Sequence, residues 1–178
     1  MKVLIASDLH GSAYYADRLI RIFEGSGADL LVLLGDVYNH GPRNPLHEGY
    51  APMEVANQLN RVKDRLLVVK GNCDSQVDTL ISEFHFVEDA CLVLGGHKVY
   101  LTHGHVYHKD RLPAICPGDT LVYGHYHAVL CEDVDGVHVL NPGSISLPKD
   151  DHRAYILMDE KGAEILDLDG KRLAKMDF

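Results

Sequence analysis

Residues 30–36 read LLVLLGD, and this stretch decides the fold that the sequence predicts. Five consecutive apolar residues are typical of a strand buried on both faces, as in the parallel sheets of α/β proteins. Gly35 allows the backbone to turn where that strand ends. The carboxylate of Asp36 is then directed into the space above the sheet, which makes Asp36 a candidate metal ligand.

Four other apolar stretches end in the same way, with side chains that can bind metal ions. They are VLIASDLH at residues 3–10, LLVVKGNCD at 66–74, VYLTHGH at 99–105 and TLVYGHYH at 120–127. Together the five stretches bring carboxylate, amide and imidazole groups to the ends of five predicted strands.

A helical pattern separates the first two of these strands. Ser12 can cap a helix with a continuous apolar face, and this helix should end at the glycines of residues 25–27. A strand, helix and strand in succession join parallel strands through a right-handed crossover. We therefore expect Asp8, His10 and Asp36 at one carboxyl edge of the sheet, where open α/β sheets bind ligands.

The remaining pattern is mixed. We expect a long loop at residues 38–52, a helix at 53–63 and an antiparallel meander at 84–102. A further hairpin is expected between residues 128 and 140, and the last 26 residues have the pattern of antiparallel strands. The expected architecture is one domain, residues 1–178, with a parallel half followed by an antiparallel half and with helices outside two packed sheets.

Composition narrows the possible partners. The 178 residues include 17 Lys and Arg against 26 Asp and Glu, and the net charge of −9 works against binding of extended nucleic acid.

The cysteines form no C-x-x-C pair, and we expect Cys91, Cys116 and Cys131 to be small buried side chains. Neither a signal-peptide pattern nor an apolar run of about 18 residues is present, so the sequence predicts a cytoplasmic protein that does not enter the membrane.

The candidate ligands suit two metal ions. Oxygen and imidazole ligands without thiolates favour divalent Mn, Fe, Co or Zn over Ca²⁺ or Cu(I). Seven ligands are more than one small ion uses when a position stays open for substrate, whereas two ions sharing one carboxylate account for the number. A single histidine is more often a surface or packed residue than a ligand, but this set has no packing rationale. The candidates are Asp8, His10, Asp36, Asn72, His103, His125 and His127.

The order of these motifs resembles the calcineurin-like metallophosphoesterases. The resemblance rests on DLH at residues 8–10, GD at 35–36, GNCD at 71–74, HGH at 103–105 and GHYH at 124–127. More narrowly, the stretches GDVYNHGPRN and NPGS, which begin at Gly35 and Asn141, are similar to the YfcE-like bacterial phosphodiesterases. The resemblance covers nearly the whole chain, and it implies an α/β fold, a four-layer αββα sandwich of two mixed β-sheets.

The resemblance also implies a site with two divalent metal ions, most typically Mn²⁺, with Fe, Zn, Co or Ni as alternatives. It assigns Asp8, His10, Asp36 and His127 to the first ion, and Asp36, Asn72, His103 and His125 to the second. A hydroxide bridging the two metals then attacks the phosphorus atom in line. Catalytic roles fall to Asn72, Cys73 and Asp74, and Arg43 in the long loop is a candidate for binding a phosphate oxygen of the substrate.

Three functions remain open at this stage. Cys73 lies where many members of the wider family carry a histidine that protonates the leaving oxygen, a task for which a thiol is less suited. That difference favours a phosphodiesterase, although a phosphomonoesterase or nucleotide phosphatase would share every ligand. A non-catalytic metal-binding scaffold is the alternative of another class, because a eukaryotic retromer subunit has a similar fold.

The expected partner is a small phosphate-ester substrate, and the chain is a possible homo-oligomer because antiparallel strands offer edges for pairing. A solvated surface position is the alternative for Arg43. His40 and His47 are expected at the surface of the long loop.

Overall fold

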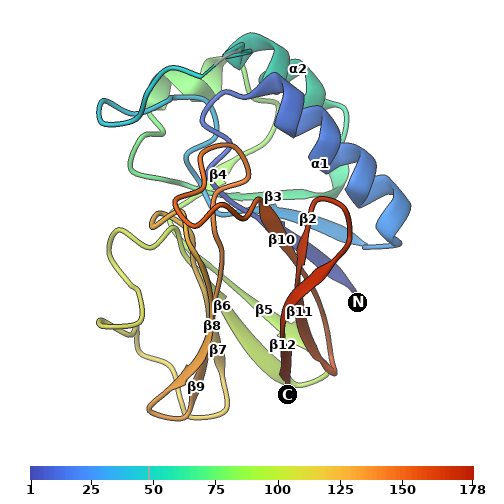
Figure 1. Ribbon diagram of the computed structural model, residues 1–178, viewed down its shortest axis with the longest axis vertical. Helices are drawn as coiled ribbons and strands as arrows, with labels where there is room; N and C mark the ends of the chain where they lie inside the picture. Colours follow the sequence, from blue (N-terminus) through green and yellow to red (C-terminus); the bar gives the residue numbers. More distant parts are fainter. Residues whose placement is uncertain (48) are drawn as a thin grey trace.

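The computed structural model describes residues 1–47 and 49–178, and it contains two β-sheets packed face to face (Figure 1). The larger sheet consists, in spatial order, of β12 (Arg172–Asp177), β11 (Gly162–Asp167), β10 (Ala154–Asp159), β1 (Val3–Ala6), β2 (Leu30–Leu33), β3 (Leu66–Val69) and β4 (Phe86–Val87). The smaller sheet consists of β5 (Ala90–Leu94), β6 (His97–Leu101), β7 (Thr120–Val122), β9 (Val137–Pro142) and β8 (Val129–Val134). The helices are α1 (Ala13–Ser26), α2 (Pro52–Asn60) and the short 3₁₀ helices η1 (Lys63–Arg65) and η2 (Gln76–Leu80).

Strand direction places the predicted ligands on one side of the molecule. The five apolar stretches form β1, β2, β3, β6 and β7. In the larger sheet β1, β2 and β3 run parallel to one another, and in the smaller sheet β6 runs parallel to β7. The loops after these strands gather on the left side of Figure 1, where the carboxyl ends of both sheets lie. The predicted α/β class and the pair of packed mixed sheets are confirmed, since each sheet also contains antiparallel strands.

Both faces of the larger sheet are buried, which explains the unbroken apolar runs in its central strands. Leu4 and Leu31 belong to the core beneath α1 and α2, whereas Val3 and Val32 belong to the core between the two sheets. All four side chains are fully buried. A strand between two cores has no solvent-facing position, so the polar residues of these segments fall at the strand ends.

Helix α1 follows the predicted pattern. Ser12 is its N-cap, and the buried side chains of the helix are the four apolar residues that repeat along one face. Gly27 ends the helix with φ of 69°, a left-handed conformation that glycine adopts without the steric cost of a Cβ atom. The loop that follows leads directly into β2, so α1 is the crossover between two parallel strands.

We predict that Ser12→Ala lowers the free energy of unfolding by about 1 kcal/mol. The Ser12 hydroxyl accepts a hydrogen bond from the backbone N–H of Tyr15, at 3.4 Å, and alanine leaves that donor unsatisfied. Thermal unfolding followed by circular dichroism should show a midpoint lower by about 2–4 °C. An unchanged midpoint would contradict this role for the cap.

The second helix is shorter than predicted. Helix α2 ends at Asn60 rather than continuing to Lys63. The backbone N–H of Val62 bonds to the carbonyl of Leu59, three residues back, so the chain tightens at this point and continues as η1.

The expected division into a parallel half and an antiparallel half is wrong. Strand β4, predicted as part of a meander, pairs parallel with β3 in the larger sheet, and only β5 and β6 form the antiparallel hairpin. The C-terminal strands return to the N-terminal sheet, where β10 pairs antiparallel with β1. Apolar patterns identify strands but not their partners, and the free edge of β1 is completed by residues about 150 positions away.

The outer surfaces of the two sheets are covered differently. Helices α1 and α2 cover the larger sheet, whereas Leu112 and Ile115 from the segment 107–117 pack on the outer face of the smaller sheet. In the part of the chain that the structure describes, the second helical layer of the αββα arrangement is therefore a loop. No helix among these residues is long and apolar enough to cross a membrane.

The expected burial of three cysteines is also corrected. Cys91 and Cys116 are exposed and Cys131 is only half-buried. Cys91 lies on the outward-facing side of the edge strand β5, and Cys116 lies in the loop before β7, so neither position faces a core.

Candidate metal centre

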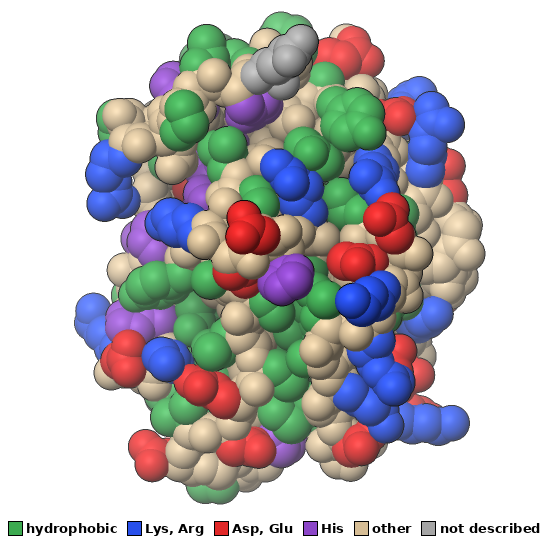
Figure 2. Space-filling model, viewed as in Figure 1, with side chains coloured by type: hydrophobic (Ala, Val, Ile, Leu, Met, Phe, Trp, Pro, Cys, Tyr) green, Lys and Arg blue, Asp and Glu red, His purple; other side chains and the backbone are tan. Residues whose placement is uncertain are grey.

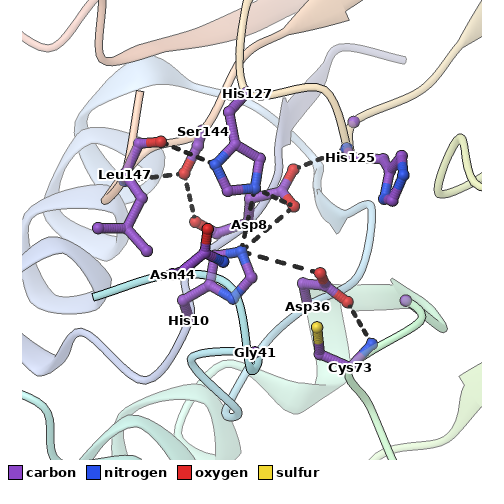
Figure 3. A network of polar contacts seen from close by, with 12 residues as sticks. Asp8, His10, Asp36, Gly41, Asn44, Cys73, His125, His127, Ser144 and Leu147 are labelled. Carbon is purple, nitrogen blue, oxygen red and sulfur yellow. Dashed lines mark hydrogen bonds and ion pairs between the residues drawn. The ribbon is translucent and has the colours of Figure 1, made fainter. Parts of the chain in front are cut away.

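The seven predicted ligands lie together as a continuous cluster at the carboxyl ends of five strands. Asp8 and His10 follow β1, Asp36 follows β2, Asn72 follows β3, His103 follows β6, and His125 and His127 follow β7. Each of them has an N or O atom within 4 Å of another member of the set. Because the strands come from both sheets, the cluster lies where the two sheets meet. Figure 3 shows part of it, with Asp8, His10, Asp36, His125 and His127 labelled.

Asp36 lies between two groups of imidazoles. Its Oδ2 atom is 3.8 Å from Nε2 of His10, and its Oδ1 atom is 3.5 Å from Nε2 of His103. Oδ1 also accepts a hydrogen bond from the backbone N–H of Cys73, at 2.8 Å, which holds the carboxylate in this orientation. The two oxygens of one carboxylate therefore face two different parts of the cluster.

Backbone conformation distinguishes five of the candidate ligands from most of the chain. Non-glycine residues rarely adopt positive φ, which costs roughly 1–3 kcal/mol where it occurs. Seven non-glycine residues in the described chain have positive φ, and five of them are candidate ligands. They are Asp8 (59°), His10 (47°), Asp36 (52°), His125 (64°) and His127 (61°). Strain concentrated at these positions is typical of a functional site.

Backbone carbonyls orient the imidazoles. The Nδ1–H groups of His10, His103 and His127 donate to the carbonyls of Asn39 (2.8 Å), Leu34 (2.6 Å) and Leu147 (2.7 Å), respectively. Each bond fixes the ring orientation and leaves Nε2 free to act as a ligand. In all three rings, Nε2 points toward the carboxylates of the cluster.

The environment of Asp8 fits a bound cation. Its side chain is fully buried, and its Oδ1 atom accepts no hydrogen bond from the described residues. Nε2 of His127 lies 3.2 Å from that oxygen, while Oδ2 accepts a bond from the backbone N–H of His125 at 3.0 Å. A buried carboxylate oxygen without a donor is costly unless a charge or metal ion compensates it. The residues present therefore suit a divalent ion.

Neighbouring charges set the ionisation of these groups, and a metal ion that binds His103 would have to displace its proton. Burial opposes the charged form of Asp8, but contacts with the neighbouring imidazoles outweigh it and lower the pKa below its usual range. Burial also favours neutral His103, yet the hydrogen bond to Asp36 raises the pKa of His103 to about 9. Burial and the charge of His103 lower the pKa of His125 to about 4. Anionic carboxylates surrounded by imidazoles form a ligand set for borderline divalent metals.

The turn after β3 places its residues in different environments. Asn72 is exposed, and its Oδ1 atom lies 3.0 Å from Nε2 of His103. The Cys73 thiol is close enough to His10 and Asp36 for the three ligand atoms to lie within 4.8 Å of one another. Burial, followed by the charge of Asp36, raises the pKa of Cys73 to about 12, so the thiol is protonated.

Asp74 is occupied by backbone groups. Its Oδ2 atom accepts the N–H groups of Asp36 (2.8 Å) and Gly71 (2.7 Å), and its Oδ1 atom accepts the N–H group of Val37 (2.8 Å). Burial raises the pKa of Asp74 to about 6. The carboxylate joins the loops that follow β2 and β3, which favours a positioning role over contact with substrate.

A cleft of about 230 Å³ opens beside the cluster. Figure 2 shows histidine side chains along the left side of the molecule, over the loops at the carboxyl ends of the strands. Arg43 lines this cleft, which places the predicted phosphate-binding residue beside the candidate ligands. A larger hollow of about 420 Å³ lies among β10, β11 and β12, but its lining contains no candidate ligand.

The long loop is more closely tied to the cluster than the sequence indicated. His47 is not a free surface residue, because its Nε2 atom donates to the carbonyl of His10 at 3.0 Å. His40 is also partly buried, with its ring 5.5 Å from that of Tyr50, so the expectation of two surface histidines is wrong. Histidine occurs in loops for many reasons, and no sequence signal indicated these contacts.

Residues of the NPGS motif, and Ser146 just after it, also support the cluster, although no role was predicted for them. The hydroxyls of Ser144 and Ser146 donate to the carbonyl of Asp8 at 2.8 and 2.9 Å. Asn141 donates to the carbonyl of Gly124 at 2.8 Å, which holds the turn before His125. The motif itself, at the end of a strand, was the only sequence signal for them.

Comparison with known proteins agrees with this geometry. Residues 1–163 match the model of the calcineurin-like phosphoesterase superfamily domain. The chain is 42% identical over 175 residues to the phosphodiesterase YfcE of Escherichia coli K12, covering 97% of this chain and 95% of YfcE. It is 29% identical to the probable metallophosphoesterase YsnB of Bacillus subtilis, covering 96% and 98% of the two chains.

Solved structures show the same fold. The structure of E. coli YfcE, described as a phosphoesterase, superposes with a TM-score of 0.95 at 40% identity and covers 99% of each chain. Vacuolar protein sorting 29 from Cryptosporidium parvum superposes with a TM-score of 0.65 at 22% identity, covering 99% and 97% of the chains, which shows a shared fold alone. With the family model matching residues 1–163 and 42% identity to a phosphodiesterase over nearly the whole chain, the chain belongs to the calcineurin-like phosphoesterase superfamily.

Proposed function

We propose that this protein is a metal-dependent phosphodiesterase that hydrolyses small phosphate diesters at the cluster described above. The observation that carries the proposal is the position of Asp36, whose two carboxylate oxygens face His10 on one side and His103 on the other. A carboxylate in this position is suited to bridge two divalent ions. When bound, such a pair activates water for in-line attack and neutralises charge on the phosphate oxygens.

The ligands divide into two overlapping groups around Asp36. Asp8, His10 and His127 would hold one ion with Asp36, in agreement with the close approach of their donor atoms. The other ion would be held by Asp36 together with the second group: Asn72, His103 and His125. Mn²⁺ is the expected metal, and Fe, Zn, Co and Ni suit the same oxygen and nitrogen donors.

Two side chains of the cleft can bind the substrate phosphate. Arg43 presents a planar fork of N–H donors that matches phosphate oxygens. The amide of Asn72 lies at the rim of the cleft, where it can stabilise charge that develops on the phosphate in the transition state. These residues orient the ester, while the buried ligands hold the centre in place.

The family relationship supports hydrolysis over a scaffold role. The E. coli relative with 42% identity is a phosphodiesterase. All seven candidate ligands are present, and three of their imidazoles are oriented by backbone carbonyls. A scaffold has no need for an open cleft lined by oriented donors.

The test is hydrolysis of bis-p-nitrophenyl phosphate and p-nitrophenyl phosphate side by side. The protein is first stripped of metal and then supplied with Mn²⁺, and metal content is measured in both states. Diester turnover that returns only with added metal supports the proposal. Absence of turnover of both esters, with two metal ions bound per chain, would contradict it and favour a scaffold.

Cys73→His is predicted to increase monoester hydrolysis relative to diester hydrolysis. The thiol is a poor donor to an alkoxide leaving group, whereas an imidazole with a pKa near 6.5 donates well. General acid catalysis contributes about 10²–10⁴-fold, so we expect at least about a tenfold rise in the monoester-to-diester ratio of kcat/KM for alkyl esters. Cys73→Ser is the matched control, and a ratio that is the same in the histidine and serine variants would refute this role.

The free cysteines bear on the cellular location of the protein. Four free cysteines suit a reducing compartment, in agreement with a cytoplasmic protein.

The edge strands β4, β5, β8 and β12 offer surfaces for pairing in a homo-oligomer. Light scattering at micromolar concentration that gives only the monomer mass would exclude such an oligomer.

A further inference from the structure

The cleft contains a second cation, Lys149, to which neither the family motifs nor the proposed chemistry assigns a role. Most of the 17 lysines and arginines have a partner, either an acidic side chain, a backbone carbonyl or an aromatic ring. Among the described residues, those whose cationic groups make no such contact are Arg43, Arg61, Lys149, Lys161 and Lys171. Two of these five, Arg43 and Lys149, line the same cleft.

The backbone of Lys149 is fixed by the metal centre itself. Its N–H group donates to the carbonyl of His127 at 2.8 Å, and Nδ1 of His127 donates to the carbonyl of Leu147 at 2.7 Å. Leu147 in turn donates its N–H to the hydroxyl of Ser144, at 2.9 Å, which is bonded to Asp8. The segment that carries Lys149 therefore wraps around His127, and its position relative to the centre is set by several hydrogen bonds.

Arg43 and Lys149 reach the cleft from different sheets. Arg43 belongs to the long loop after β2, whereas Lys149 belongs to the segment after β9. Their chemistry also differs, because the arginine fork suits one phosphate in a fixed orientation and a lysine ammonium is a mobile point charge. Two cations of this kind are suited to bind two separate anionic groups.

Charge explains why such an arrangement is useful here. The chain carries a net charge of −9, which repels anions at long range. Unpaired cations in a cleft give a local attraction, and a diester phosphate with one negative charge leaves the second cation without a partner. The cleft volume of about 230 Å³ is below the roughly 300 Å³ at which pockets for drug-sized ligands begin, so a compact second group fits.

We infer that Lys149 binds a second anionic group on the substrate, and that the preferred substrates are diesters whose ester portion carries an additional negative charge. This inference rests on the proposed phosphodiesterase function and specifies its substrate class. Lys149 acts as a specificity-determining residue, while Arg43 binds the phosphate that is hydrolysed.

The test compares two esters of equal size and equal leaving group, p-nitrophenyl 3-carboxypropyl phosphate and p-nitrophenyl 4-methylpentyl phosphate, with the Mn²⁺-loaded protein. We expect the natural protein to favour the charged ester by about tenfold in kcat/KM. Lys149→Ala should lower kcat/KM for the charged ester by about tenfold more than for the neutral ester, and Lys149→Arg should restore most of the preference. Lys171→Ala, which removes an unpaired lysine outside the cleft, should leave the preference unchanged.

A binding measurement separates this inference from the proposed activity. Calorimetry compares the affinities of the protein for 3-phosphonopropionate, which carries a carboxylate, and for propylphosphonate, which does not. The natural protein should bind the carboxylate ligand more tightly, and Lys149→Ala should reduce this difference in affinity without weakening the binding of propylphosphonate. If the protein hydrolyses neither ester but this advantage depends on Lys149, the phosphodiesterase proposal fails and the second anion site stands. If the preference for charge is absent, or is equal in the natural protein and Lys149→Ala, the inference is overturned.

Discussion

Asp36→Asn should abolish metal-dependent diester hydrolysis, with kcat lower by at least about 10³-fold. Asparagine keeps the size of the side chain but replaces one charged oxygen with an NH₂ group that cannot bind a cation. In the structure the two oxygens of Asp36 face His10 and His103, so both halves of the cluster lose a ligand or its charge. Metal content, measured by plasma mass spectrometry after dialysis, should fall from two ions per chain to one or fewer.

Asp17→Asn is the matched control for this variant. Asp17 forms an ion pair with Arg21 on the surface of α1, and exposed pairs four residues apart on a helix contribute only about 0.3–0.5 kcal/mol. Turnover and metal content should therefore stay at the level of the natural protein. Retention of both ions and more than about a tenth of the turnover in Asp36→Asn would rule out a bridging role for Asp36.

Asp74→Ala should destabilise the protein by about 3 kcal/mol and also remove activity. The carboxylate accepts three backbone N–H groups, from Asp36, Val37 and Gly71, and alanine leaves all three buried donors unsatisfied. Burial of the charge, which raises the pKa of Asp74 to about 6, offsets part of this contribution, so the loss is smaller than three full hydrogen bonds to a charged group. The melting temperature should fall by roughly 6–12 °C for a chain of this length.

Thermal unfolding in the presence of a chelator isolates this effect from metal binding. Asp74→Asn is the graded control, because its remaining oxygen can still accept the N–H groups of Asp36 and Gly71. It should lose about half as much stability as Asp74→Ala. Equal melting temperatures for the natural protein and both variants would show that the two loops are held by other contacts.

The positions of the candidate ligands could be predicted because strand ends and metal chemistry both appear locally in the sequence. The stretch at residues 30–36 marks a strand buried on both faces, and the acidic residue after it has to leave the sheet at the carboxyl edge. The same argument places Asp8 and His103. In the structure, His103 approaches Asp36, and Asp8 approaches His10 and His127. Positive φ at five candidate ligands was not predictable from these motifs, because positive φ stays uncommon even for histidine and aspartate, in which it is enriched.

Strand partners could not be predicted in the same way. A short apolar strand such as β4 can pair with any free edge, and its pairing with β3 depends on the full set of competing edges. The C-terminal strands complete the sheet that the N-terminus begins, a contact between residues far apart in the chain. Patterns within a window of a few residues contain no information about such pairings.

The sequence by itself therefore determined the α/β class, the strand ends and the identity of the candidate ligands, because each depends on neighbouring residues alone. Only the tertiary structure decided which strands share a sheet, which carbonyls orient the imidazoles and which cations line the cleft. Asp74 and Lys149 illustrate the difference, since an aspartate and a lysine in loops are unremarkable until their neighbours are known. Those neighbours come from distant segments, and chain folding alone brings them together.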